Sequence, residues 1–431
     1  MIAKPVVVII EEQSMRGMRL GSCCLLLSCT SLLLAEDWPA WRGSHGDGHS
    51  SAKNPPLKWS RTENVRWKVP LPAPGNSSPI VCKDRVFLTQ ALEQGRRRAV
   101  LCFRRADGRL LWQRETLYTE DEPTHETNPH CSASPVTDGE RVIASLGSAG
   151  MVCYDFAGKE LWRKDLGKLE HIWGTASSPI LYGDLAILWC GPGERQFLLA
   201  VKKTSGETVW RHEEPGGKSG KAGPKEWLGS WCTPIVARIG DHDELILGVP
   251  KKLKAFDPKT GAELWSCSGM GDLVYASPVI SEDGIVIAVS GYYGPALAVR
   301  AGGKGDVTDT RRLWHHTQKH PQRIGSPVIL GEHAYLLNES GLAQCFDLKT
   351  GEDLWKQERV SRESWSSPVY AAGRLYINTM KGDTLVLSAS PKYELLARNS
   401  LGERVLSSIA AARDELFIRS YEHLWCLGNG K

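Results

Sequence analysis

The sequence predicts an all-β fold, an eight-bladed β-propeller of four-stranded antiparallel blades. Three observations predict it: a phrase that recurs along the chain, a second marker found eight times, and complementary half-copies of the phrase at the two ends. The phrase is most complete at residues 255–265 and again at 345–355. Recurrence at intervals of roughly 40 to 55 residues, without a long helical stretch between copies, is typical of propellers and solenoids.

Each copy of the phrase predicts a strand, a tight turn and a second strand. In the copy at 255–265, Asp257 offers a side-chain acceptor to the turn and Gly261 can take positive φ. Each copy ends in Trp, and a buried Trp removes on the order of 150 to 250 Å² from water. We therefore expect the Trp residues at this position to lock neighbouring blades together: Trp67, Trp112, Trp162, Trp210, Trp265, Trp314 and Trp355.

The second marker is Ser-Pro followed by a β-branched residue. Proline is tolerated where a strand begins, so each copy predicts entry into the innermost strand of a blade. There are eight such entries, one with Thr in place of Ser and the last without Pro: Ser78, Ser134, Ser178, Thr233, Ser277, Ser326, Ser367 and Ser408. Eight entries predict eight blades.

The two chain ends carry complementary halves of one phrase. Residues 64–69 form an alternating strand that ends at Trp67 without a first half, whereas residues 423–428 begin the phrase and the chain then stops. We expect the N- and C-terminal strands to pair within one blade, which closes the ring and removes a free sheet edge.

Three segments are expected: a signal peptide at 1–35, a lead-in at 36–63 and the propeller at 64–431. Residues 20–35 are mostly apolar, too short to span a bilayer, and followed by acidic residues, as in a secretory signal cleaved near Ala35. Export to the periplasm or cell envelope is the expected localisation.

The extreme N-terminus suggests two further features. Glu11 and Glu12 stand where a signal peptide needs positive charge, so translation is expected to start at Met15 or Met18. Residues 26–29 resemble a lipobox, which would make Cys29 a lipid anchor; the apolar run beyond it argues against this reading. Membrane association is otherwise expected only through a partner.

Composition excludes several classes of function. The net charge is +4, from 53 basic and 49 acidic residues, so no nucleic-acid partner is expected. The basic run at 96–98 is predicted to be a solvated loop. Four of the nine cysteines beyond the signal, Cys102, Cys153, Cys345 and Cys426, occupy one repeat position that holds alanine in other copies. This pattern indicates small apolar core residues and neither a disulfide framework nor a metal site.

The phrase and the Ser-Pro entries together resemble the pyrroloquinoline quinone (PQQ) repeat, over about residues 64–431. This repeat occurs in quinoprotein alcohol dehydrogenases and in the non-enzymatic BamB-like factor of outer-membrane protein assembly. Residues 37–43 also resemble the mature start of exported PQQ-like propellers from planctomycete-type bacteria. The resemblance implies the eight-bladed fold but does not by itself choose between enzyme and binding protein.

The resemblance favours a non-catalytic protein-binding scaffold of the cell envelope, BamB-like and monomeric, with envelope proteins or peptides as partners. The enzymatic branch carries adjacent cysteines near the quinone, and here the adjacent pair is Cys23-Cys24 in the signal. It also needs calcium held by Glu and Asn, and no motif transfers those roles. The alternatives are a PQQ- and calcium-dependent oxidoreductase with a reduced active site, or a carbohydrate- or peptide-binding propeller.

The position three residues before each entry proline is predicted to lie near one mouth of the central channel. It supplies the candidate binding residues Asn76, Trp231, Tyr275 and Trp365, with Arg323 nearby. The aromatic side chains could stack on a planar ligand or a peptide side chain. The alternative is that they simply plug the channel.

Overall fold

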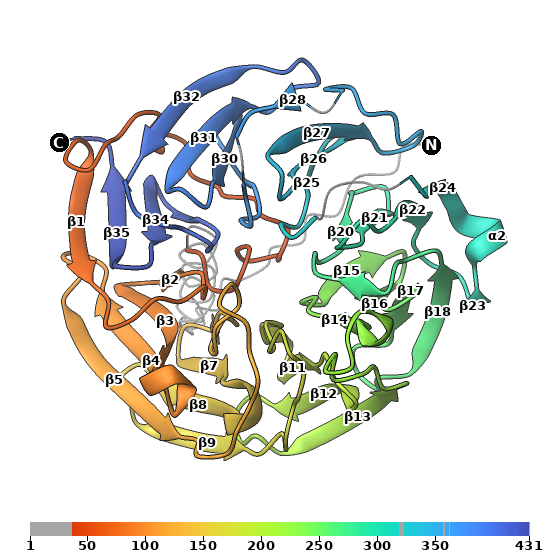
Figure 1. The fold of residues 1–431 in the computed structure, drawn as a ribbon, viewed down its shortest axis with the longest axis horizontal. Coiled ribbons are helices and arrows are strands. Elements are labelled where there is room, and N and C mark those ends of the chain that lie inside the picture. The colour runs from red at the N-terminus through yellow and green to blue at the C-terminus, as the bar shows by residue number, and fades with distance from the viewer. Residues whose placement is uncertain (1–36, 319–322, 357, 362, 431) are drawn as a thin grey trace, which may run out of the picture.

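The computed structural model describes residues 37–430 except 319–322, 357 and 362. These residues form a ring of eight blades around a central axis, which confirms the predicted fold (Figure 1). The expected signal peptide, the start at Met15 or Met18 and the lipidation site at Cys29 lie outside the described residues. None of the helices formed by the described residues has the length and apolar character needed to cross a bilayer.

Each blade is an antiparallel sheet whose strands follow one another from the axis outward. The innermost strands of blades 1 to 7 begin directly after their entry prolines, which have no N–H to offer the ladder. The strands of blades 1 to 4 are β2 (Ile80–Cys82), β3 (Arg85–Leu92), β4 (Arg97–Arg104) and β5 (Leu110–Leu117); β6 (Val136–Thr137), β7 (Arg141–Ser145), β8 (Met151–Asp155) and β9 (Glu160–Lys164); β10 (Ile180–Tyr182), β11 (Leu185–Cys190), β12 (Gln196–Lys202) and β13 (Thr208–Glu214); and β15 (Ile235–Ile239), β16 (His242–Val249), β17 (Lys252–Phe256) and β18 (Glu263–Ser268).

The second half of the ring follows the same plan. The strands of blades 5 to 8 are β20 (Val279–Ile280), β21 (Ile285–Val289), β22 (Ala296–Arg300) and β24 (Arg312–His316); β25 (Val328–Leu330), β26 (His333–Leu337), β27 (Leu342–Asp347) and β28 (Glu358–Arg359); β29 (Val369–Ala371), β30 (Arg374–Asn378), β31 (Asp383–Ser388) and β32 (Leu395–Ser400); and β33 (Ala410–Ala412), β34 (Glu415–Arg419), β35 (His423–Gly428) and β1 (Val65–Pro70). The short elements are β14 (Gly229–Ser230), β19 (Leu273–Val274), β23 (Gly305–Asp306), α2 (Thr308–Arg311) and the 3-10 turns η1 (Glu93–Gly95), η2 (Gly147–Ala149) and η3 (Pro224–Glu226).

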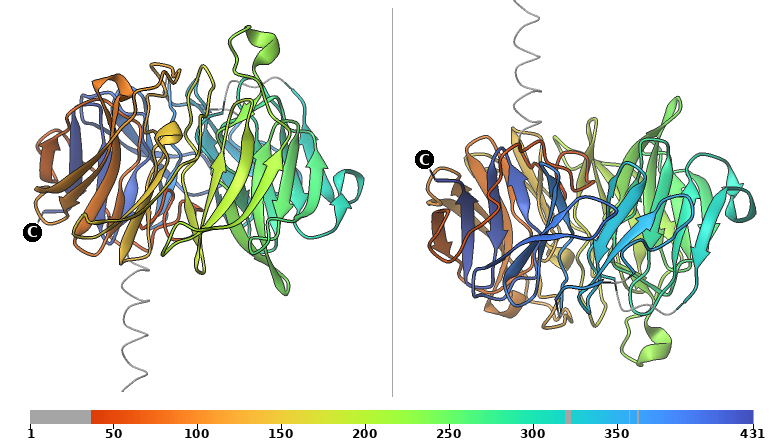
Figure 2. Two further views of the ribbon diagram at one scale, coloured as in Figure 1. Left: turned by 90° about the horizontal axis from the view of Figure 1, so that it is seen from below. Right: turned by 90° about the horizontal axis from the view of Figure 1, so that it is seen from above.

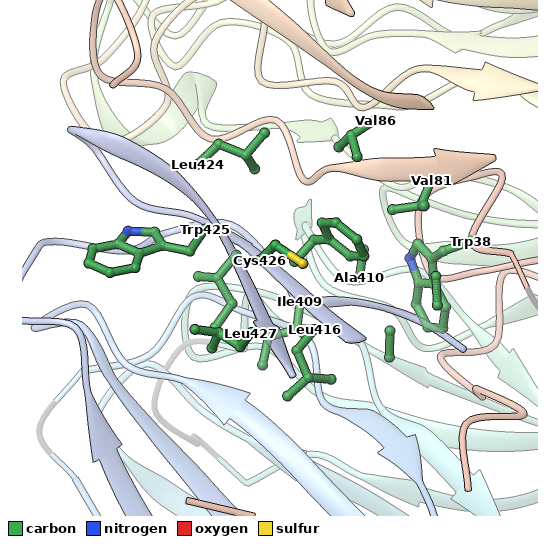
Figure 3. Close-up of a cluster of buried hydrophobic side chains, with 14 of the residues drawn as sticks. Trp38, Val81, Val86, Ile409, Ala410, Leu416, Leu424, Trp425, Cys426 and Leu427 are labelled. Atoms are coloured by element: carbon green, nitrogen blue, oxygen red, sulfur yellow. The ribbon is translucent and has the colours of Figure 1, made fainter. Parts of the chain in front are cut away.

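Blade 8 joins the two ends of the described chain, as predicted. Strand β1 pairs antiparallel with β35, and Lys68 lies opposite Trp425. A buried apolar cluster surrounds this closure and includes Trp38, Val81 and Trp425, each at most 1% exposed (Figure 3). Side chains from the lead-in, from blade 1 and from blade 8 therefore share one core.

Two blades depart from the simple repeat. The Gly-rich insertion of blade 5 supplies β23, which adds to β18 of blade 4 as a fifth, parallel strand. In blade 6 the copy of the phrase at 345–355 does not open a strand at its Trp, contrary to the prediction from that copy. The Asp353 carboxylate accepts the main-chain N–H groups of Cys345 and Trp355, at 3.3 and 3.2 Å, and thereby replaces the local ladder.

The seven repeat Trp side chains lie between successive blades. In five cases the indole packs on a turn glycine of the following blade, and a Cβ atom on that glycine would come within 2.5 to 2.9 Å of the ring. These glycines also have positive φ, so both the turn and the indole require glycine. The five pairs are Trp67–Gly108, Trp112–Gly158, Trp162–Gly206, Trp210–Gly261 and Trp314–Gly351.

The same indoles form hydrogen bonds between blades. Six of the seven N–H groups donate to a main-chain carbonyl of the next blade, at 2.7 to 3.2 Å. Trp265 is the exception, because its N–H donates to the carboxylate of Glu244 in its own blade at 2.8 Å. Glu244 in turn accepts the N–H of Gly302 in the blade 5 insertion at 3.4 Å, so the link to the next blade is indirect.

A closed ring of hydrogen bonds joins the eight strand entries. The main-chain N–H of each entry residue donates to the hydroxyl of the next entry, at 2.9 or 3.0 Å. The ring closes where the N–H of Ser408 donates to the hydroxyl of Ser78 at 2.9 Å. The hydroxyl at this position therefore has a structural role that a strand-entry motif alone does not reveal.

Replacement of one ring hydroxyl is expected to cost about 1 kcal/mol of unfolding free energy. In Ser134→Ala the buried N–H of Ser78 loses its acceptor, whereas the backbone and the packing are otherwise kept. Urea denaturation followed by circular dichroism measures the change. Ser44→Ala, at an exposed position, is the control and should leave the midpoint unchanged. An equally unchanged midpoint for Ser134→Ala would contradict the prediction.

The described part of the lead-in, residues 37–63, crosses the axis on the face opposite the long loop that carries η3 (Figure 2). Trp38 exchanges main-chain hydrogen bonds with Val81 of blade 1, both at 2.8 Å. Arg42 is fully buried on the other side of the axis, where it donates to the carbonyl of Ser326 at 3.0 Å, and burial lowers its pKa to about 10. The lead-in thus spans the channel and covers its end.

Candidate functional site

A cavity of about 350 Å³ lies on the axis, above the lead-in. All eight positions three residues before an entry proline, or before its equivalent Ile409 in the last blade, line it. Four of them are the candidates Asn76, Trp231, Tyr275 and Trp365. The other four are Ser132, Ala176, Ile324 and Leu406. Trp41 of the lead-in also lines the cavity and forms its floor.

Arg323, the remaining candidate, does not line the cavity. Its side chain is buried beside it, and Nη1 donates to the carbonyl of Gly294 at 3.2 Å. Burial lowers its pKa to about 10, against the opposing charge of Asp353. Arg323 therefore supports the turn between β21 and β22, and this turn carries the lining residue Tyr292.

Aromatic rings form a continuous wall on the side of blades 3 to 5. The ring of Trp231 lies 5.2 Å from that of Tyr275 and 6.0 Å from that of Trp173. Trp227 lies 4.9 Å from Trp173 and 5.7 Å from Tyr292, which brings the wall to the open mouth. The predicted aromatic positions of the strand entries thus meet aromatic residues from three connecting segments that the repeat pattern did not single out: Trp173, Trp227 and Tyr292.

Glu339 adds a negative charge to this wall. It lies in the turn between β26 and β27, and its main-chain carbonyl accepts the N–H of Ser364 at 3.1 Å, next to Trp365. Within the described chain its carboxylate has no hydrogen bond or ion pair. The pKa of Tyr275 is raised, first by burial and then by the charge of Glu339, which shows that the two groups are close.

Two further lining groups are buried without a partner among the described residues: Asn76 Oδ1 and Trp365 Nε1. The amide nitrogen of Asn76 donates to the carbonyl of Thr127 at 2.7 Å, which leaves the oxygen as an unused acceptor. Trp231 differs from Trp365, because its N–H donates to the carbonyl of Gly174 at 2.8 Å. Two residues of the cavity lining thus each carry a buried polar atom whose hydrogen-bonding capacity is unused among the described residues.

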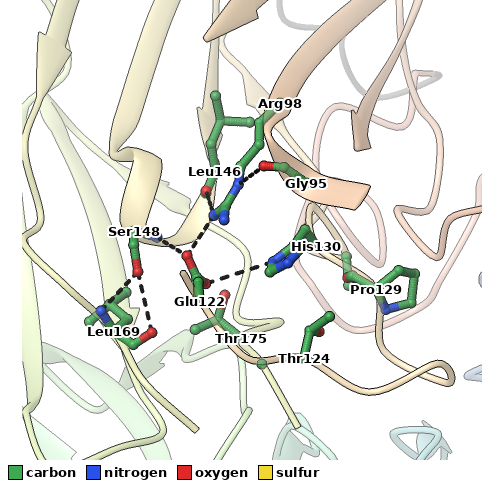
Figure 4. Close-up of polar contacts among 12 residues, drawn as sticks. Gly95, Arg98, Glu122, Thr124, Pro129, His130, Leu146, Ser148, Leu169 and Thr175 are labelled. Atoms are coloured by element: carbon green, nitrogen blue, oxygen red, sulfur yellow. Dashed lines mark hydrogen bonds and ion pairs between the residues drawn. The ribbon is translucent and has the colours of Figure 1, made fainter. Parts of the chain in front are cut away.

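The loop between β5 and β6, residues 118–135, forms part of the mouth and is held by a buried ion pair (Figure 4). Arg98 Nη1 lies 2.8 Å from Glu122 Oε2, and both side chains are 2% exposed. Arg98 Nε donates to the carbonyl of Gly95 at 3.0 Å, and the N–H of Ser148 donates to Glu122 at 3.3 Å. The prediction of a solvated loop at 96–98 is therefore wrong for Arg98.

His171 supports the aromatic wall from behind. Its ring lies 4.9 Å from that of Trp231, its Nδ1 accepts the N–H of Trp173 at 3.2 Å, and burial lowers its pKa to about 4. In the unfolded chain a histidine has a pKa near 6.5, so the unfolded state binds a proton that the folded state excludes. This difference destabilises the fold as the pH falls from about 6.5 toward 4.

We therefore expect His171→Phe to reduce the pH dependence of stability in that window. Urea denaturation at pH 7 and at pH 5 measures it, and the wild type should lose more stability on acidification than the variant. His45→Phe, at an exposed position, should behave like the wild type. His130 has a pKa of about 4 for the same reason of burial, so some dependence should remain in His171→Phe. An identical loss in His171→Phe and wild type would contradict the assignment.

Among the described residues, two clusters of carboxylates and histidines outside the cavity have the spacing of metal ligands. Two groups lie close enough to share an ion: His212 with Glu214 and Glu263, and Glu403 with Glu422 and His423. In the first, the ammonium of Lys254 lies 2.8 Å from Glu214 and 3.0 Å from Glu263. In the second, Glu403 is paired with His423 at 2.8 Å. Both groups are already accounted for as ion pairs.

Comparison with known proteins identifies related chains. A family model described as outer membrane protein assembly factor BamB matches residues 96–357 and 340–427. The outer membrane protein assembly factor BamB of Bordetella pertussis is 24% identical over 282 residues, which cover 63% of this chain and 65% of that protein. The aligned part thus spans less than two thirds of that relative.

Solved structures share the fold at low sequence identity. The crystal structure of BamB from Moraxella catarrhalis has a TM-score of 0.58 at 15% identity, covering 84% of this chain and 96% of that one. The crystal structure of quinohemoprotein alcohol dehydrogenase from Comamonas testosteroni has a TM-score of 0.69 at 11% identity, and the match covers 92% of this chain and 81% of that one. BamB and a quinohemoprotein alcohol dehydrogenase thus both share this fold, so the fold alone does not decide between their functions.

The cavity lining does not fit pyrroloquinoline quinone. That cofactor is a polycarboxylate and needs cationic or multiple hydrogen-bond donors around its acid groups. None of the described residues that line the cavity is Lys or Arg, and Glu339 would repel an anion. The nine cysteines among the described residues are separate buried thiols, so they form no disulfide beside the axis.

Proposed function

The chain belongs to the family of the outer membrane protein assembly factor BamB, and from this premise we propose that it is a non-catalytic propeller that binds a partner polypeptide in the cell envelope. The observation that carries the proposal is the cavity at the open mouth: its aromatic wall, and a described lining that contains neither Lys nor Arg, suit binding better than quinone chemistry. A role in outer-membrane protein assembly is the finer form of the proposal, supported by a relative at 24% identity.

The proposed place of action requires export. The apolar segment before residue 36 is proposed to direct the chain through the inner membrane and to be removed near Ala35. Cell fractionation followed by mass spectrometry of the mature N-terminus tests this step. We expect the protein in the envelope fraction with residue 36 at its start; an intact N-terminus in the cytoplasmic fraction would contradict it.

Site-specific photocrosslinking tests the binding role. A photoreactive amino acid at Tyr293, which is 55% exposed at the mouth, is expected to crosslink to a defined envelope polypeptide. The same amino acid at Leu161, which is 44% exposed on an outer strand, is the matched control and should not. Equal crosslinking from both positions, or none from Tyr293, would count against a partner at the mouth.

A further inference from the structure

We propose that the axial cavity is an aromatic cage that binds an organic cation, an ammonium or guanidinium group, against the carboxylate of Glu339. The inference rests on the proposed function, because it names the ligand class of the same site. Three observations carry it: the sign of the charge in the cavity, the placement of the aromatic rings, and the hydrogen-bonding groups left without partners.

The described cavity lining carries one carboxylate, that of Glu339, and the guanidinium of Arg323 is buried beside the cavity without lining it. Glu339 is half-buried, lines the cavity, and pairs with no described side chain. No Lys or Arg is among the described lining residues, so the only strong charge that a ligand meets there is a carboxylate. Partial exclusion of water strengthens this attraction for a cation relative to the protein surface. A cationic ligand would supply the missing partner.

Aromatic rings line the same cavity as Glu339. Tyr275 and Tyr292 come from blade 5 and Trp365 from the entry to blade 7, and Glu339 in blade 6 lies between these two groups along the ring. The hydrogen bond from Ser364 to the Glu339 carbonyl fixes the carboxylate-bearing turn next to Trp365. Cations are attracted to the faces of Trp and Tyr, so rings on both sides of one carboxylate favour a cation over a neutral ligand.

The unpartnered groups match such a ligand. Asn76 Oδ1 is an acceptor for an N–H of the cation, and Trp365 Nε1 is a donor that needs an acceptor on the ligand. An arginine or lysine residue within a polypeptide supplies both a donor and an acceptor. Its positive group carries N–H donors, and its main chain carries a carbonyl acceptor. The volume of about 350 Å³ is at the lower end for ligand pockets, enough for one side chain.

The cation can come from a polypeptide side chain or from a free small molecule, and the test separates the two. Calorimetric titration of the full mature protein would use choline, its uncharged carbon isostere neohexanol, and N-acetylargininamide. We expect both cations to bind saturably and neohexanol to bind at least about tenfold more weakly than choline. Tighter binding of N-acetylargininamide than of choline, reduced selectively by Trp365→Phe, would identify a polypeptide as the source. The reverse order of affinity would identify a small molecule.

Two variants make the test specific. Glu339→Gln keeps the shape of the side chain and removes its charge, and it should weaken both cations about tenfold or more without changing neohexanol binding. Glu352→Gln, an exposed position in the same blade, should change nothing. Circular dichroism melts of both variants establish that they fold.

Three results would overturn the inference: no saturable binding of either cation at millimolar concentration, equal binding of choline and neohexanol, or undiminished cation binding in Glu339→Gln. Because the titrations use purified protein and small ligands, they can fail while crosslinking from Tyr293 still finds a partner. Conversely, the cations can bind while crosslinking from Tyr293 finds no partner. The two experiments therefore distinguish failure of the cation site from failure of the scaffold role.

Discussion

Trp355→Ala is expected to lower the free energy of unfolding by about 3 to 5 kcal/mol. Trp355 is 3% exposed between blades 6 and 7, with its ring 5.3 Å from Tyr335 and 5.5 Å from Tyr393. Its N–H donates to the carbonyl of Ser390 at 3.2 Å. The change removes the largest apolar group at this contact and leaves a cavity that the two sheets cannot close without moving as units.

Urea or thermal denaturation followed by circular dichroism measures the effect. Leu161→Ala removes a 44% exposed side chain from an outer strand and is the control, with an expected change below about 0.5 kcal/mol. A melting temperature of Trp355→Ala within about a degree of the wild type would show that this Trp does not hold the blades together.

Glu122→Ala is expected to cost a similar amount, about 3 to 5 kcal/mol, because it leaves the guanidinium of Arg98 buried without its partner. The loop at 118–135 also loses its main anchor. Since Thr127 and Asn128 of this loop line the cavity, ligand affinity at the mouth should fall together with stability. Denaturation and calorimetric titration of the same variant measure the two effects.

Two further variants test the cause. Glu120→Ala, an exposed acid in the same loop, should leave both stability and affinity unchanged. The double variant Arg98→Met, Glu122→Leu removes both charges, and it should be more stable than Glu122→Ala because no unpaired charge remains. A double variant as unstable as the single one would mean that packing, and not the unpaired charge, causes the loss.

The fold was predictable because its determinants repeat within the chain. The strand-entry motif places every innermost strand, and the half-phrase at Trp67 correctly indicates pairing with β35. Repetition also locates the cavity, since equivalent positions in equivalent blades must lie at one level around the axis. Asn76, Trp231, Tyr275 and Trp365 line it for this reason.

The features that the repeat does not contain were not predictable. Glu339 and Tyr292 lie in turns of variable sequence, and Trp41 belongs to a lead-in with no copy elsewhere in the chain. From the sequence, Arg98 was predicted to belong to a solvated basic run. In the structure it pairs with Glu122 of the loop at 118–135. Such contacts depend on how the loops fold back over the ring. The loops are not part of the repeat, so the sequence periodicity does not predict their positions.

The lead-in lies across one end of the cavity, so the mouth is at the opposite end. A ligand that enters past the mouth loops meets Trp41 of the lead-in, so we expect binding and release from the mouth side. A polypeptide can insert a single side chain or a chain terminus but cannot thread through. Arrival and departure then follow one path, past the loop residues that line the mouth.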